Sequence, residues 1–204
     1  MTANKVFCGD AAEVLKSLPQ GSANMCVTSP PYYGLRDYGI ENQIGTEQTP
    51  QEYVERLIKV FDEVYRVLMD DGTLWLNIGD SYAGSGKGKG LLQEDNVKDR
   101  PIYDKESKVF SMPNRWENIK PKDLIGIPWM LAFALRERGW YLRSDIIWHK
   151  INALPEAVKD RPAKCYEHIF LLAKSPRYYF DYKAIQEPIK EVTAARYTRG
   201  RSGK

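Results

Sequence analysis

The strongest constraint on the fold is an amphipathic helix pattern that leads directly into a strand pattern. Thr49 is a good capping residue, Pro50 suits the first helical turn, and Glu52 stands where a capping box places its acidic side chain. Apolar residues then recur at steps of three and four, at Val54, Leu57, Ile58, Phe61, Val64, Tyr65 and Leu68. We expect the Asp70-Asp71-Gly72 run to end this helix and residues 73–78 to form a strand.

Other strand and helix patterns alternate along the chain. Strand patterns lie at residues 5–9, 25–27, 140–148 and 167–173, and helix patterns lie at residues 11–18 and 128–138. This alternation predicts an α/β domain with a mostly parallel sheet. Ligands of such sheets bind beyond the carboxyl ends of the strands. Residues 9–10, 28–32 and 79–80 carry polar or turn residues at predicted strand ends, so we expect the functional site there.

The length and the local composition predict one folded domain with two irregular segments. A chain of 204 residues is long enough for a single domain with a substantial core. Residues 82–120 are rich in glycine and charge and lack periodicity, which predicts a surface insertion. Residues 184–204 are predicted to form a basic, disordered tail, which leaves residues 1–183 as the folded region.

The composition argues against a disulfide-linked, a metal-binding or a membrane-spanning protein. Cys8, Cys26 and Cys165 are far apart and form no CxxC pair, so we interpret them as reduced cytosolic thiols. With only two histidines, the chain is not expected to bind a metal. The sequence has no signal peptide and no apolar run near the ~20 residues that span a bilayer, which predicts a cytoplasmic protein without membrane contact.

Charge is distributed unevenly between the two halves of the chain. Residues 1–80 carry a net charge of −6 and residues 81–204 a net charge of +9. A basic half is compatible with a face that binds a polyanion, and equally with an unevenly charged solvated surface. Charge alone leaves both interpretations open.

A Ser-Pro-Pro-Tyr segment, Ser29 to Tyr32, directly follows the strand pattern at residues 25–27. The two prolines hold the backbone extended and lack an N–H, so their carbonyls are expected to point into a site. Ser29 adds a hydroxyl acceptor and Tyr32 adds a flat aromatic face. Acceptors around the hydrogens of an aromatic amine would draw its nitrogen toward tetrahedral geometry and free the lone pair for methylation. Positioning and fixed dipoles suffice for such a reaction, without a covalent enzyme intermediate. An isolated segment of this kind is as often a turn or a polyproline ligand.

Four segments in order resemble the DNA amino-methyltransferases of restriction–modification and phage systems. The sequence TSPPYYGLRDYG resembles their catalytic motif, and FCGDA with Leu15 resembles the segment whose Asp contacts the cofactor adenine. VYRVLMDDGTLWLNIGDSY resembles the helix and strand after the catalytic strand, and residues 140–181 resemble the later strands and a loop that holds the flipped base. The resemblance covers most of residues 5–183, in the order of the β group of these enzymes.

This resemblance implies a Rossmann-like class I methyltransferase sheet, with residues 1–183 as the catalytic region. The implied reaction moves a methyl group from S-adenosyl-L-methionine to the exocyclic amine of cytosine (N4), or less favourably adenine (N6), in double-stranded DNA. The implied catalytic residues are Ser29, Pro30, Pro31 and Tyr32. The implied cofactor contacts are Asp10, Ala11, Thr28 and Ser29. The implied DNA contacts are Tyr33, Arg36, Lys87, Lys89, Trp148, Lys150 and Arg161.

Some of these residues also have ordinary structural interpretations. Asp10 is well placed to cap a helix that begins at Ala11. Trp148 and Lys150 could be simple strand-end residues, and we give that interpretation the same weight as a place beside the base.

The family's glycine-rich cofactor loop and its ribose-binding acidic residue have no match between residue 182 and Lys204. In the β group these features lie further toward the C-terminus. We therefore expect an incomplete sheet, whose missing strands lie beyond residue 204 or come from a second chain.

Two other functions remain open at this point. One is methylation of RNA or of protein glutamine amides, although such enzymes more often have Asn where this chain has Ser29. The other is a non-catalytic or partner-dependent nucleic-acid-binding fragment, which cofactor binding would distinguish. A C5-cytosine enzyme is disfavoured because the sequence contains no Cys-Pro pair.

Overall fold

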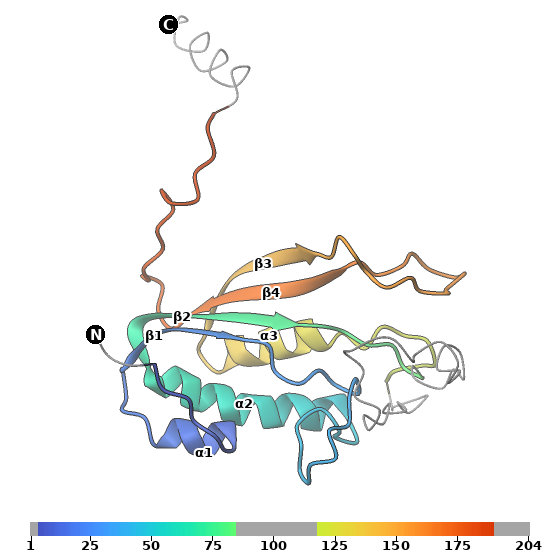
Figure 1. Ribbon diagram of the computed structural model, residues 1–204, viewed down its shortest axis with the longest axis horizontal. Helices are drawn as coiled ribbons and strands as arrows, with labels where there is room; N and C mark the ends of the chain where they lie inside the picture. Colours follow the sequence, from blue (N-terminus) through green and yellow to red (C-terminus); the bar gives the residue numbers. More distant parts are fainter. Residues whose placement is uncertain (1–3, 85–117, 190–204) are drawn as a thin grey trace, which may run out of the picture.

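A four-stranded sheet with helices on one face is the framework of the computed structural model (Figure 1). The structure describes residues 4–84 and 118–189. The helices are α1 (Ala11–Lys16), α2 (Pro50–Val67) and α3 (Ile127–Glu137). The strands are β1 (Ala23–Thr28), β2 (Leu68–Ile78), β3 (Tyr141–His149) and β4 (Tyr166–Ala173). Their order in the sheet is β1-β2-β4-β3, so β1 and β3 form its edges.

The sheet is mixed, and the prediction of a mostly parallel sheet is wrong for the described residues. β1 and β2 are parallel and are joined through α2, whereas β4 is antiparallel to both β2 and β3. Parallel neighbours need a crossover connection, usually a helix. Residues 150–165, between β3 and β4, contain no helix, so the chain turns back on itself there.

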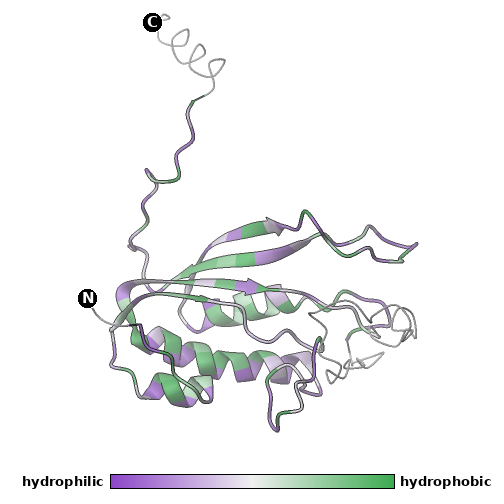
Figure 2. Cartoon of the chain, viewed as in Figure 1, coloured by the Kyte–Doolittle hydropathy of each residue, from purple (hydrophilic) through white to green (hydrophobic). Residues whose placement is uncertain are grey.

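The helix pattern around α2 is confirmed in detail. Thr49 Oγ1 accepts from Glu52 N at 3.2 Å, and Glu52 Oε2 accepts from Thr49 N at 3.1 Å, which completes the capping box. Apolar and polar bands alternate along α2 in Figure 2. Its buried side chains are Pro50, Tyr53, Val54, Leu57, Phe61, Val64 and Val67. The acidic run at residues 70–72 does not end the helix, since β2 already begins at Leu68.

The core lies between the sheet and the helices. Leu74 and Leu76 of β2, Phe170 of β4 and Leu131 and Leu135 of α3 have no exposed surface. Each such side chain contributes roughly 1.5–3 kcal/mol through burial. This packing fixes the positions of the strand ends, and of the loops that follow them, relative to the helices.

The N-terminus of α3 is anchored to the loop after β2. The Asp80 carboxylate accepts from the backbone N–H groups of Ser81 at 2.9 Å, Gly126 at 3.0 Å and Ile127 at 3.0 Å. Gly126 offers no side-chain cap of its own, so Asp80 caps the helix from a distance. The polar end of β2 is therefore tied directly to the second core helix.

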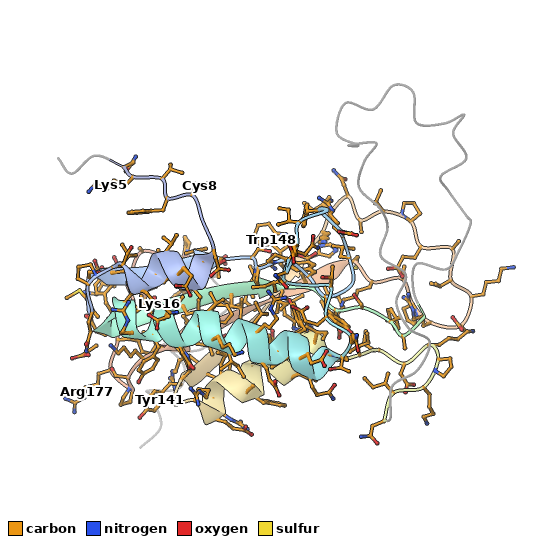
Figure 3. All side chains as sticks on the ribbon, turned by 90° about the horizontal axis from the view of Figure 1, so that it is seen from below. Lys5, Cys8, Lys16, Tyr141, Trp148 and Arg177 are labelled. Carbon is orange, nitrogen blue, oxygen red and sulfur yellow. The ribbon has the colours of Figure 1, made fainter. Side chains whose placement is uncertain are left out.

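Residues 5–9 do not form the expected strand. A strand needs a hydrogen-bonded neighbour, and within the described residues β1 pairs only with β2. Lys5 and Cys8 lie on a segment that projects from the body of the domain (Figure 3). The edge at β1 is apolar, because Met25 is 56% exposed and Val27 is 68% exposed.

The two predicted irregular segments lie mostly outside the described residues. These are residues 85–117 of the insertion, which include Lys87 and Lys89, and residues 190–204 of the tail. The two sides of the insertion meet at Ala83 N, which donates to Asp123 O at 2.9 Å. Residues 184–189 contain no helix or strand. Within the described ranges, no helix is long and apolar enough to cross a membrane.

Candidate active site

The Ser29–Tyr32 segment begins where β1 ends, at the carboxyl edge of the parallel β1/β2 pair. Thr28, the last residue of β1, pairs with Leu76 of β2, so the turn at Gly79 and Asp80 lies beside the segment. Two of the three predicted polar strand ends therefore lie together, as expected. The third, at residues 9–10, is not part of the sheet.

The Tyr32 hydroxyl lies within a polar network at this edge. Its oxygen lies 2.9 Å from both Asn77 Oδ1 and Glu167 Oε2, and Ser29 Oγ donates to it at 3.4 Å. Lys150 Nζ donates to the other oxygen of Glu167. Burial raises the pKa of Tyr32 to about 12, so the phenol stays protonated at physiological pH.

The ring of Tyr32 rests against the bare backbone of Gly79. A Cβ added at Gly79 would lie 2.6 Å from Tyr32 Cε2 and 2.8 Å from Cδ2, closer than real contacts allow. A side chain at position 79 would therefore displace the ring.

The two proline carbonyls differ in their surroundings. The sequence predicts that both carbonyls point freely into a site, and this is wrong for Pro31 O, which accepts from Tyr53 Oη of α2 at 2.7 Å. Within the described residues, no hydrogen bond occupies Pro30 O. Pro30 and Ser29 thus keep acceptors that a target amine could use, whereas Pro31 attaches the segment to α2.

Tyr33 is a core residue, which corrects its assignment as a DNA contact. Its side chain is 1% exposed and packs against Tyr53, with ring centroids 5.3 Å apart. Its carbonyl accepts from Ser81 Oγ at 3.1 Å. The sequence predicts a loop over the target base from Tyr33 onward, but the Tyr33 ring packs against Tyr53 of α2 in the core instead.

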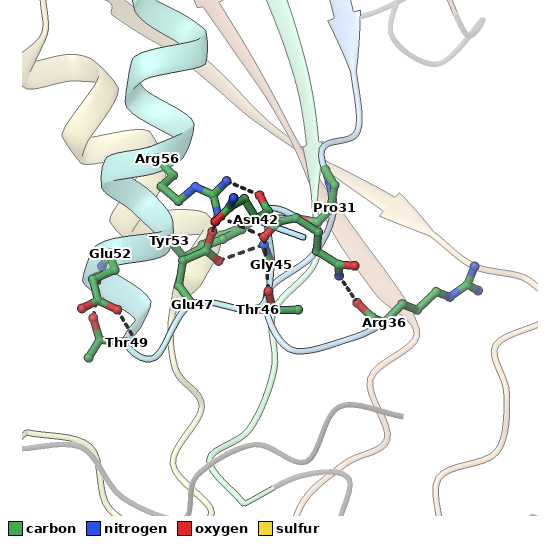
Figure 4. Close-up of polar contacts among 11 residues, drawn as sticks. Pro31, Arg36, Asn42, Gly45, Thr46, Glu47, Thr49, Glu52, Tyr53 and Arg56 are labelled. Carbon is green, nitrogen blue, oxygen red and sulfur yellow. Dashed lines mark hydrogen bonds and ion pairs between the residues drawn. The ribbon is translucent and has the colours of Figure 1, made fainter. Parts of the chain in front are cut away.

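A clamp formed by Glu47 and Arg56 holds the loop after the segment (Figure 4). The Glu47 side chain is 5% exposed; it accepts from Arg56 Nη1 at 2.8 Å and from Gly45 N at 2.8 Å. Arg56 Nη1 also donates to Gln43 O at 2.9 Å. Gly45 fits closely under the motif, since an added Cβ would lie 2.9 Å from Tyr32 O. The clamp thereby supports the backbone of the Ser29–Tyr32 segment.

Two hollows flank the segment. One, of about 430 Å³, is lined by Met25, Val27, Thr28, Ser29, Trp75, Asn77 and Ile169 on the sheet face that the helices leave open. The other, of about 330 Å³, is lined by Ser29, Pro30, Pro31, Tyr32, Leu35, Arg36 and Tyr38. Ser29 borders both, so it lies between two spaces that a donor and an acceptor molecule could occupy.

The predicted cofactor residues are only partly brought together. Thr28 and Ser29 line the larger hollow, whose mostly apolar wall and size suit one side of a nucleoside-containing ligand. Asp10 caps α1, since its Oδ1 accepts from Glu13 N at 3.1 Å, and Ala11 begins that helix. In the described part of the chain, no hydrogen bond links Asp10 to Ser29. The residues present therefore fit one wall of a cofactor site.

Of the remaining candidate DNA residues, two are exposed and two are held in ion pairs. Arg36 is exposed beside the smaller hollow. Trp148 is 56% exposed near the end of β3, where Figure 3 labels it. Lys150 is paired with Glu167, and Arg161 lies 3.9 Å above the Tyr82 ring while it pairs with Glu156. Among the described residues, no group of His, Cys, Asp and Glu side chains could hold a metal ion.

Asn77 and Glu167 are site residues that the sequence analysis missed, whereas the turn at Gly79 was expected at the site without its contact to Tyr32. Each contacts Tyr32 from a strand or turn at least 45 residues away. Asn77 was the one available signal, because it is a polar residue at the end of an otherwise apolar strand.

Comparison with known proteins identifies the family of this sequence. The family model described as DNA methylase, which covers N6 and N4 methyltransferases, matches residues 23–203. Type II methyltransferase M.Cfr9I of Citrobacter freundii is 52% identical over 182 residues, or 89% of this chain and 58% of that protein. Type II methyltransferase M.SmaI of Serratia marcescens is 48% identical over 187 residues, or 92% of this chain and 61% of that protein. The chain thus spans about three fifths of the length of these relatives.

Solved structures share the fold. PvuII DNA methyltransferase (cytosine-N4-specific) matches with a TM-score of 0.59 and 16% identity, over 95% of this chain and 62% of that one. A putative DNA modification methylase of Thermus thermophilus, TTHA0409, solved in complex with S-adenosyl-L-methionine, matches with a TM-score of 0.53 and 23% identity, over 90% of this chain and 55% of that one. The sheet is therefore the Rossmann-like methyltransferase sheet expected from the sequence. This chain belongs to the DNA methylase family.

Proposed function

We propose that the protein containing this chain methylates the exocyclic amine of cytosine at N4 in double-stranded DNA, with S-adenosyl-L-methionine as the methyl donor. The observation that carries the proposal is the position of Ser29, which borders both hollows at the carboxyl end of β1. The names of the relatives, Type II methyltransferases, support the same reaction class. A neutral hydroxyl at position 29 is sufficient for a cytosine amine, which favours N4 over adenine N6.

In this proposal, Ser29 and Pro30 act on the target amine and Tyr32 holds the base. The Ser29 hydroxyl and the Pro30 carbonyl accept hydrogen bonds from the amine, which frees the nitrogen lone pair. Bound in the larger hollow, S-adenosyl-L-methionine supplies the methyl group. The amine nitrogen would bond to the methyl carbon as the carbon–sulfur bond breaks, the sulfonium would leave as a neutral thioether, and the displaced amine proton would pass to solvent. Because the base is inside the duplex, it must first leave the stack, and Tyr32 then packs against it.

Substitutions in the segment test this assignment. We expect Ser29→Ala and Tyr32→Ala each to lower methyl transfer to DNA by roughly two orders of magnitude or more, because each removes a group that positions the reacting base. Initial rates with the complete protein measure this, and circular dichroism shows whether the variants fold. Near-normal rates in both variants would refute the assignment.

A partner-dependent, inactive fragment is the second candidate, and the open β1 edge is the observation that favours it. Residues 4–9 are outside the sheet, and only one wall of a cofactor site is present in the described residues. Under this candidate, the 204-residue chain would contribute the catalytic segment while other protein segments complete the cofactor site. Methyl transfer by the complete protein supports the first candidate, and its absence despite cofactor binding supports the second.

A further inference from the structure

Four contacts hold the Tyr32 side chain, one of which is the hydrogen bond that Ser29 Oγ donates at 3.4 Å, and only Glu167 is an ionised group. The ring rests on Gly79, and the hydroxyl oxygen lies 2.9 Å from Asn77 Oδ1 and 2.9 Å from Glu167 Oε2. The phenol has one proton to donate, so the two acceptors compete for it. Asn77 also donates from Nδ2 to His168 O at 3.2 Å, which orients its amide oxygen toward Tyr32.

Glu167 is the stronger of the two acceptors. Burial alone would raise the pKa of Glu167, but hydrogen bonds from Lys150 and Tyr32 outweigh it and leave the pKa below the usual value. The side chain is therefore a carboxylate at neutral pH, and hydrogen bonds to ionised acceptors are roughly twice as strong as neutral ones. Its side chain is 16% exposed, so solvent competes little for this bond.

The arrangement joins distant parts of the chain at one ring. Glu167 lies near the start of β4 and Lys150 follows β3, while Tyr32 follows β1 at the opposite side of the sheet. The direction of the ring axis is the property that the contact between Glu167 and Tyr32 controls directly.

We propose that Glu167 is a positioning residue, which holds the Tyr32 hydroxyl and so fixes the direction of the ring axis, while Lys150 holds the carboxylate in place. This inference depends on the proposed function, in which Tyr32 packs against the target base. A ring held at its edge by Gly79 and at its hydroxyl by Glu167 has little freedom to rotate away from a stacked base. Small misplacements of positioning groups lower rates by up to about a hundredfold.

A double-mutant cycle on the complete protein tests the positioning role. We expect Tyr32→Phe and Glu167→Leu each to lower kcat for DNA methylation between about tenfold and a hundredfold, with KM for DNA changed less than about twofold. Because Glu167→Gln keeps a hydrogen-bond acceptor, its kcat should lie between those of the wild type and Glu167→Leu. In the Tyr32→Phe background, either change at Glu167 should have no further effect, because its contact is already lost. If the decreases in kcat of the two single variants multiply in the double variant, the two residues act independently and the proposal is overturned.

The matched control is Glu63→Gln, which also breaks a partly buried ion pair, in this case with Arg66 of α2. It should leave kcat unchanged. If Glu63→Gln lowered kcat as much as Glu167→Gln, a general loss of stability would explain both results, and the proposal would fail.

A second readout does not depend on activity. In protein labelled with ¹³C-tyrosine, the Tyr32 signal is identified by its absence from Tyr32→Phe. We expect Glu167→Leu to shift the Tyr32 Cζ resonance and Glu63→Gln to leave it in place. If the wild-type protein does not methylate DNA, the proposed function fails, and this shift still decides whether Glu167 holds Tyr32. If the protein is active and Glu167→Leu leaves the Tyr32 Cζ resonance in place, the positioning role of Glu167 is refuted while the proposed function stands.

Discussion

At the scale of single residues, the ionisation of Glu167 links the site to stability. Its pKa in the folded protein lies below the usual value of 4.5, so its stabilising effect is complete above about that pH. The effect is lost as the pH falls through the lower, folded-state pKa, because the carboxylate is then protonated in both the folded and the unfolded chain.

We therefore expect the stability difference between the wild-type chain and Glu167→Gln to narrow in acid. At neutral pH the variant should be less stable by no more than about 1 kcal/mol, since the pair with Lys150 is partly exposed to solvent. Urea unfolding from about pH 7 to about pH 3 measures this difference. A difference that stays constant across this range, or widens in acid, would contradict the ionisation assigned to Glu167.

The residues that the sequence could predict are those within one short motif. Ser29, Pro30 and Tyr32 follow from local chemistry, because a rigid turn after a strand points its acceptors outward. Glu167 could not be predicted, because it reaches Tyr32 only through the pairing of β2 and β4. The contact of Gly79 with Tyr32 depends likewise on the pairing of β1 and β2, although the turn itself was expected at the site. Tyr33 was misassigned for a related reason, since burial of a tyrosine in a loop depends on the helix packed behind it.

At the scale of elements, the helix predictions were accurate and the strand directions were not. α2 and α3 begin and end within a few residues of their predicted limits, because capping and apolar spacing are local properties. Strand direction depends on the connections, and the helix-free segment at residues 150–165 reverses β4 relative to β3. The unpaired segment at residues 5–9 shows that an apolar run forms a strand only when a neighbour is available.

The Glu47–Arg56 clamp connects the N-terminal half of α2 to the loop that supports the catalytic segment. We expect Arg56→Met to destabilise the chain by about 2 kcal/mol or more, because it leaves the buried Glu47 carboxylate without its cation. Lys16→Met, which breaks the exposed pair with Glu13, is the matched control and should have no measurable effect.

Thermal and urea unfolding of the three proteins measure the effect of the clamp. Adding Glu47→Gln to Arg56→Met should recover part of the loss, because a neutral amide is easier to bury than an unpaired carboxylate. If Arg56→Met is as stable as Lys16→Met, the clamp does not hold the loop.

At the scale of the whole molecule, the open apolar edge at β1 sets the behaviour of the isolated chain. Unpaired strand edges favour association with other chains. We expect the 204-residue chain alone to self-associate and to bind S-adenosyl-L-methionine weakly, and Val27→Lys to reduce the association. Ile147→Lys, on the opposite edge strand β3, shows whether that edge also takes part in association, and we expect it to have the smaller effect.

Analytical ultracentrifugation measures association in these variants, and calorimetry measures cofactor binding by the wild-type chain, because Val27 itself lines the larger hollow. Co-expression with a C-terminal segment that carries a glycine-rich loop should strengthen cofactor binding. Tight binding and full turnover by the chain alone would show that the larger hollow is a complete cofactor site.

We propose that the segment from Ser29 to Tyr32 positions an exocyclic amine of DNA for methylation. The most direct test is mass spectrometry of nucleosides from DNA treated with the complete protein, wild type and Ser29→Ala side by side. We predict N4-methylcytosine with the wild-type protein and its near absence with Ser29→Ala. N6-methyladenine in its place would contradict the assigned base, and equal methylation by the two proteins would contradict the assigned site.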